Sequence, residues 1–130
     1  MGVFHTKGNK CCHVVLRGGS EGPNYGSENI AFAKELMRKS GMTPSIVVDC
    51  SHGNSLKRPE LQPLVMKDVI SQVVAGESSI SGMMIESYLL TGRQCVVPGE
   101  TPAPGLSITD ACLGWDETEA AVMDAFKALS

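Results

Sequence analysis

The stretch VVLRGG at residues 14–19 joins three apolar residues to an arginine and two glycines. A similar arrangement recurs in IVVDCSH at residues 46–52 and in GMMIE at residues 82–86, where the apolar run again leads to a side chain that can carry charge. Continuous runs of apolar, largely β-branched residues are typical of strands that are buried on both faces, as in parallel sheets. The three stretches therefore predict three parallel strands, each with a polar group at its carboxyl end.

We place the three strands at residues 12–17, 45–50 and 80–86, and a helix is predicted after each of them. The first helix follows a glycine-rich loop and ends before Gly41, because glycine favours the left-handed backbone that terminates a helix. The second begins at Pro59 and ends at Gly76; the third begins near Asp116, with Glu119 as its capping-box partner. The residues expected to face the core are Ile30, Ala33, Leu36 and Met37 in the first helix, Leu61, Leu64, Val65, Val69 and Val73 in the second, and Val122, Ala125, Phe126 and Leu129 in the third.

The spacing of the strand ends indicates repeated βα units. Arg17 and His52 are 35 residues apart, and His52 and Glu86 are 34 residues apart. Each interval contains one predicted strand and one predicted helix, so the fold class is α/β with three βα units. These units can belong to a doubly wound sheet or to an arc of a (β/α)₈ barrel, and the pattern alone leaves both open.

Four chargeable residues are expected at one edge of this sheet. The carboxyl ends of parallel strands open onto one face, where α/β proteins bind their ligands, and Arg17, His52 and Glu86 follow three such ends. Asp110, after a proline-rich loop, is placed to join them. Imidazole and carboxylate groups suit Mn²⁺, Fe²⁺ or Zn²⁺, and an arginine beside glycine N–H groups suits a phosphate or carboxylate. The alternative is structural: Arg17 pairs with Asp49 or Glu86 across the sheet.

Composition excludes several classes of function. The chain of 130 residues is 42% apolar, which is enough for one core. A net charge of −3 and an aromatic content of 5% argue against nucleic-acid partners, and no apolar run is long enough to cross a membrane. Five cysteines without a C-x-x-C pair, together with an N-terminus that lacks an apolar signal region, lead us to expect a reducing, cytoplasmic environment.

Five blocks in a fixed order carry a more specific signal. From about Gly8 to about Phe126, the sequence resembles the type I 3-deoxy-7-phosphoheptulonate (DAHP) synthases of aromatic amino-acid biosynthesis. The blocks are CCHVVLRGG (11–19), PNY (23–25), VVDCSHGNS (47–55), GMMIES (82–87) and SITDACLGW (107–115).

The resemblance implies a fold, a reaction and a set of site residues. Residues 1–130 would be the C-terminal part of a TIM barrel domain, its sixth to eighth strands. The enzymes condense phosphoenolpyruvate with erythrose 4-phosphate and water, the first step toward chorismate, and release phosphate. They need a divalent metal (Mn, Fe, Zn or Co), and we expect homo-oligomers of the full-length enzyme. By resemblance, His52, Glu86 and Asp110 are metal ligands. Arg17 holds the phosphoenolpyruvate phosphate, Asp110 also contacts the aldose, and Arg17, His52 and Asp110 form the catalytic set.

One departure from the family affects these expectations. Family members are much longer, and the first five strands, with the family's cysteine metal ligand, have no counterpart in this sequence. We therefore expect the chain alone to be only marginally stable as a monomer and to lack synthase activity. The alternative function is that of an inactive half-barrel that binds or regulates a full-length synthase.

Overall fold

A computed structural model describes residues 2–9 and 11–130. Its sheet contains β1 (Val14–Leu16), β2 (Ile46–Asp49) and β3 (Ile80–Met84) in the order β1-β2-β3, and both pairs of strands are parallel. The prediction of three parallel strands is thus confirmed, although each strand is shorter than the sequence suggested.

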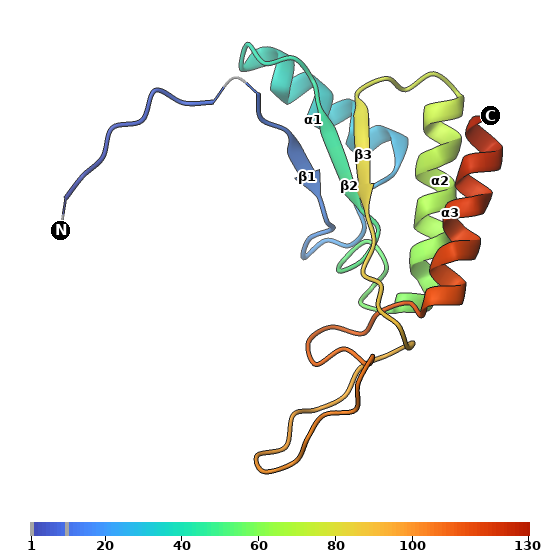
Figure 1. Ribbon diagram of the computed structural model, residues 1–130. Coiled ribbons are helices and arrows are strands. Elements are labelled where there is room, and N and C mark those ends of the chain that lie inside the picture. The colour runs from blue at the N-terminus through green and yellow to red at the C-terminus, as the bar shows by residue number, and fades with distance from the viewer. Residues whose placement is uncertain (1, 10) are drawn as a thin grey trace.

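The helices alternate with the strands. They are α1 (Ser27–Lys39), α2 (Gln62–Val74), which is preceded by the 3₁₀ turn η1 (Pro59–Leu61), and α3 (Trp115–Leu129). Figure 1 shows that the strands run in one direction and the helices return in the other, so the loops that follow β1, β2 and β3 gather at the same lower end. Among the described residues, no helix combines the length and the apolar character needed to cross a membrane.

The core lies between the sheet and its helices. Side chains alternate along β2, where Ile46 and Val48 are fully buried and pack with residues of α1 and α2. The helix residues that are buried in this core are Ile30, Ala33 and Met37 in α1 and Val65, Met66, Val69 and Ile70 in α2. This layered arrangement anchors β2, the strand from which the His52 loop emerges.

The predicted apolar stripes are wrong in part. Leu36 of α1 and Leu64 of α2 are exposed, and α2 buries Met66 and Ile70 in addition to the predicted Val65 and Val69. The buried face of α2 differs from the predicted one because this helix packs both against core residues of the sheet and against α3.

The prediction for α3 fails more widely. Val122, Phe126 and Leu129 are exposed, and only the small residues Ala121 and Ala125 pack against the core. Small side chains let α3 approach α2 closely, and Figure 1 shows the two helices side by side. The large apolar residues of α3 therefore face outward.

The capping residue of α3 also differs from the prediction. The helix begins at Trp115, after Gly114, and the carboxylate of Glu117 accepts the Gly114 N–H at 2.8 Å. Glu117, not Glu119, is the capping partner, because the N-cap is Gly114, two residues before the predicted Asp116, and the third helical residue is therefore Glu117. In contrast, the predicted end of α1 is confirmed: Gly41 has a φ of 73° and donates its N–H to the carbonyl of Arg38.

Candidate metal centre

His52 lies in the loop that follows β2, in an unusual backbone conformation. Its φ is 50°, a left-handed value that is uncommon for residues other than glycine. Such strain persists only where surrounding contacts enforce it, and it is concentrated at functional sites. The side chain is 23% exposed, which leaves one edge of the imidazole ring accessible.

The other edge of the ring is held by Asp49, which is 2% exposed. Nδ1 of His52 lies 2.8 Å from Oδ2 of Asp49 and 2.8 Å from the hydroxyl of Ser51. The other carboxylate oxygen of Asp49 accepts the N–H of Ser51 at 2.9 Å and its hydroxyl at 2.5 Å. These contacts fix the orientation of the ring and direct Nε2 away from the protein core.

Two glycines let the loops after β1 and β2 cross in direct contact. A Cβ atom on Gly18 would lie 2.5 Å from the carbonyl carbon of Gly53, and Gly18 has a φ of 77°. Gly53 donates its N–H to the carbonyl of Arg17 at 3.0 Å. Glycine at both positions therefore brings the loop with His52 against the end of β1.

A buried asparagine links the same two loops. Asn54 donates to the carbonyls of Leu16 (3.0 Å) and Asp49 (2.8 Å), at the ends of β1 and β2. The side-chain oxygen of Asn54 accepts the backbone N–H of Asn24, and the side-chain oxygen of Asn24 accepts the backbone N–H of Gly18, both at 2.7 Å. The PNY and HGNS segments are thus parts of one scaffold that fixes the His52 loop.

Glu86 follows β3 and is positioned from α2. The side chain of Gln62, which is 1% exposed, accepts the backbone N–H of Glu86 at 2.8 Å and donates to its carbonyl at 3.1 Å. Burial is the main cause that raises the pKa of the Glu86 carboxyl above its ordinary value. His52 and Arg17 oppose this rise in the pKa of Glu86, whereas the neighbouring carboxylates of Asp110 and Asp49 add to it.

Asp110 comes from the long loop between β3 and α3. Two backbone hydrogen bonds between Gly92 and Cys112 close the base of this loop, at 2.8 and 3.1 Å. Further out, the side chain of Gln94 exchanges hydrogen bonds with the backbone of residues 103–106. The Asp110 side chain is 60% exposed but is directed back toward His52.

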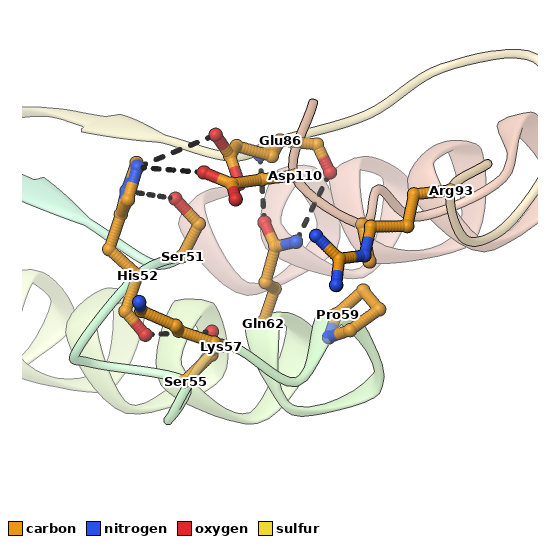
Figure 2. A pocket seen from close by; sticks show the side chains of 10 residues that line it. Ser51, His52, Ser55, Lys57, Pro59, Gln62, Glu86, Arg93 and Asp110 are labelled. Atoms are coloured by element: carbon orange, nitrogen blue, oxygen red, sulfur yellow. Dashed lines mark hydrogen bonds and ion pairs between the residues drawn. The ribbon is translucent and has the colours of Figure 1, made fainter. Parts of the chain in front are cut away.

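Three of the four predicted site residues converge at this edge of the sheet. Nε2 of His52 lies 3.5 Å from Oε1 of Glu86 and 3.7 Å from Oδ2 of Asp110 (Figure 2). One nitrogen or oxygen atom from each residue lies within 4.8 Å of the other two. Ligand bonds of about 2.1 Å place tetrahedral donors about 3.4 Å apart, so this donor set fits a first-row divalent metal.

The three residues line a cavity of about 230 Å³ that sequence reasoning did not fully anticipate. Lys57 and Arg93 also line it, so two positively charged side chains border the carboxylates. Lys57 lies in the loop after β2, five residues after His52, and this proximity was an available signal. Arg93 lies in an irregular loop, and no sequence pattern distinguishes it from an ordinary surface arginine.

Arg17 is the predicted site residue that does not line this cavity. It follows β1 directly and is exposed, on the same edge of the sheet as the three converging residues. In residues 2–9 and 11–130, Arg17 forms no ion pair with Asp49 or Glu86, and Asp49 instead contacts His52. The structural alternative for Arg17 is therefore not found in the described part of the chain.

Comparison with known proteins gives the family. The sequence model of the DAHP synthetase I family matches residues 1–123. The chain belongs to this family. Within it, the chain is 44% identical over 117 residues to the phospho-2-dehydro-3-deoxyheptonate aldolase of Haemophilus influenzae, covering 90% of this chain and 32% of that protein. The tyrosine-inhibited aldolase of Schizosaccharomyces pombe is 44% identical over 131 residues, covering 98% of this chain and 35% of the relative.

A solved structure from the same enzyme family agrees with these matches. The phospho-2-dehydro-3-deoxyheptonate aldolase of Francisella tularensis superposes with a TM-score of 0.88 at 35% identity, covering 98% of this chain and 37% of that one. The chain therefore spans about a third of the length of these DAHP synthetase I relatives. Its resemblance to an enzyme family of aromatic amino-acid biosynthesis is thereby confirmed.

Proposed function

We propose that this chain forms the metal-binding part of a DAHP synthase active site. In this proposal, the enzyme condenses phosphoenolpyruvate with erythrose 4-phosphate and water, as the family resemblance implies. The carrying observation is the convergence of His52, Glu86 and Asp110, which come from three separate loops and place their donor atoms within 4.8 Å of one another. Three protein ligands with an open position are typical of catalytic metal sites.

The proposal includes an arc of a TIM barrel formed by β1, β2 and β3, the sixth to eighth strands of the complete fold. The parallel order β1-β2-β3 and the loops gathered at the carboxyl ends of these strands support it. Val15 and Met84 are 40% and 45% exposed, as expected for strands that would face further barrel strands and the barrel interior. In the described part of the chain, the five cysteines are free thiols, which fits the expected cytoplasmic location.

Each residue has a distinct role in the proposed site. His52 offers Nε2, and Glu86 and Asp110 each offer a carboxylate oxygen, to a bound divalent metal. Such a metal supplies Lewis-acid polarisation of an aldehyde oxygen. Asp110, the most exposed of the three, is also placed to contact the aldose, and Arg17 at the end of β1 would hold the phosphoenolpyruvate phosphate. The two basic residues on the cavity wall, Lys57 and Arg93, favour anionic substrates such as these.

Metal titration of the chain by isothermal calorimetry tests the proposal. We expect Mn²⁺ or Zn²⁺ to bind once per chain with a dissociation constant near micromolar, which corresponds to about 8 kcal/mol. His52→Ala should remove this binding, because it deletes one of only three ligands. His5→Ala is the matched control, since His5 is exposed and lies outside the cavity. Native protein that binds neither metal, or His52→Ala that binds as well as the native chain, would refute the proposed site.

A further inference from the structure

We propose that Asp49 is a positioning residue that keeps the proton of His52 on Nδ1 and leaves the lone pair of Nε2 free. This inference rests on the proposed function, since Nε2 is the atom assigned to the metal. Asp49 itself is outside the ligand set, because its carboxylate is fully engaged by His52 and Ser51 and does not line the cavity.

The hydrogen bonds of Asp49 determine which nitrogen of the His52 ring carries the proton. Oδ1 accepts two donors from Ser51, its N–H and its hydroxyl, so the single hydroxyl proton is committed to Asp49. Oδ2 then faces Nδ1 of His52 at 2.8 Å. An ionised carboxylate only accepts hydrogen bonds, so a neutral imidazole satisfies this contact only with its proton on Nδ1.

The surroundings of Nε2 show why the position of the ring proton needs to be fixed by Asp49. Glu86 and Asp110 lie 3.5 and 3.7 Å from Nε2, and both are acceptors that would favour a proton there. A proton on Nε2 blocks the lone pair that a metal needs. Asp49 opposes it from a buried position, and carboxylates that act on metal-binding histidines in this way commonly change metal affinity 10- to 100-fold.

The Asp49→Asn substitution should reverse the tautomer of His52 while it keeps the shape of the side chain at position 49. The backbone N–H of Ser51 always donates, so the amide oxygen must take the position of Oδ1. The NH₂ group then faces Nδ1 and donates to it, which forces the ring proton onto Nε2. The same substitution on a catalytic histidine's aspartate is known to give the wrong tautomer with the geometry intact.

The experiment uses ¹⁵N-labelled chain and two readouts. Long-range ¹H–¹⁵N spectra at pH 8.5, about two units above the ordinary imidazole pKa, identify the protonated nitrogen of His52 in the metal-free protein. Calorimetric titration with Zn²⁺ measures affinity. We expect a proton on Nδ1 in the native chain, a proton on Nε2 in Asp49→Asn, and a 10- to 100-fold weaker Zn²⁺ affinity in that variant.

Two controls separate positioning from general damage. Ser51→Ala removes the hydroxyl but keeps the carboxylate, so the Nδ1 proton should remain. Asp116→Asn makes the same chemical change at an exposed residue in the first turn of α3 and should leave Zn²⁺ affinity unchanged.

Failure of this inference is distinguishable from failure of the metal site. A native ring without a neutral Nδ1–H form would overturn the inference without any variant, even if Zn²⁺ binds. A folded Asp49→Asn that keeps the Nδ1 proton or the native Zn²⁺ affinity would also overturn it and leave the proposed function standing. A native chain with the expected tautomer but no Zn²⁺ binding would overturn the metal site and, with it, the role assigned to Asp49.

Discussion

Gly18→Ala should destabilise the chain more than any other single methyl addition at a left-handed glycine. The new Cβ would lie 2.5, 2.6 and 2.7 Å from three backbone atoms of Gly53 and Asn54, which cannot move aside as a flexible side chain can. The φ of 77° adds a second cost, because a residue with a Cβ is disfavoured in this conformation.

Both costs can be given a magnitude. Left-handed backbone costs an L-residue about 1–2 kcal/mol, and forcing extra volume into a packed site costs about 1–3 kcal/mol. The free energy of unfolding should therefore fall by about 2–5 kcal/mol in Gly18→Ala. Gly41→Ala is the matched control: its φ is 73°, but a Cβ there would meet nothing within 4 Å. It should lose only the conformational term of about 1–2 kcal/mol.

Urea unfolding followed by circular dichroism measures both variants, and Zn²⁺ titration reports on the site. We expect Gly18→Ala to weaken Zn²⁺ binding as well, because Gly53 is bonded directly to His52 in sequence and would be displaced. Gly41→Ala should bind as the native chain does. Equal stability of the two variants within about 0.5 kcal/mol, together with unchanged Zn²⁺ binding, would refute the close-approach argument.

Three further predictions concern residues away from the contact between Gly18 and Gly53. Gln62→Leu should lower the free energy of unfolding in urea by about 1–3 kcal/mol, because the backbone N–H of Glu86 loses its acceptor; an unchanged value would contradict this role. A hydrogen bond from Lys34 is the main cause that lowers the pKa of Glu77 to about 2, so the ionised form stabilises the fold above pH 4.5 and this contribution is lost as the pH falls toward 2. Glu77→Gln should accordingly be less stable than the native chain by about 1 kcal/mol at pH 7. In a series of unfolding curves, this difference in the free energy of unfolding should shrink as the pH falls below 4.5. A difference that does not change with pH would disprove the stabilising role of the ionised Glu77. Burial, with a smaller effect from a neighbouring carboxylate, raises the pKa of Cys50 to about 12. Iodoacetamide at pH 8 should therefore label the exposed cysteines but leave Cys50 unmodified until urea is added. Equal labelling of Cys50 and the exposed cysteines, measured by mass spectrometry, would argue against the burial of Cys50.

Sequence reasoning identified the candidate ligands because strand ends are local features. Apolar runs locate the strands, and parallel strands bring the residues after their carboxyl ends to one edge whatever the details of packing. His52 and Glu86 could thus be grouped before any coordinates, whereas Asp110 was added from its place after the proline-rich loop and from the family resemblance. Gly41 could be identified as a helix end from its own backbone preference. Arg17 lies on the same edge, but its distance from the cavity depends on loop geometry that the pattern does not encode.

The helix faces and the supporting residues required the tertiary structure. Which side of α2 and α3 is buried depends on what each helix packs against, so Met66 replaced Leu64 in the core and the large residues of α3 face outward. The partner of the Glu86 backbone is Gln62, 24 residues away, and no local pattern announces such a pair.

The amino-acid sequence by itself determined the order of strands and helices and the class of the fold, and it grouped three residues as candidate metal ligands. Only the tertiary structure decided that Asp49 orients His52, that Gln62 holds Glu86 and that two basic residues border the cavity. The physical reason is range: backbone preferences and strand periodicity act between near neighbours in the chain, whereas hydrogen-bond partners and buried faces are set by elements that meet only when the βα units pack together.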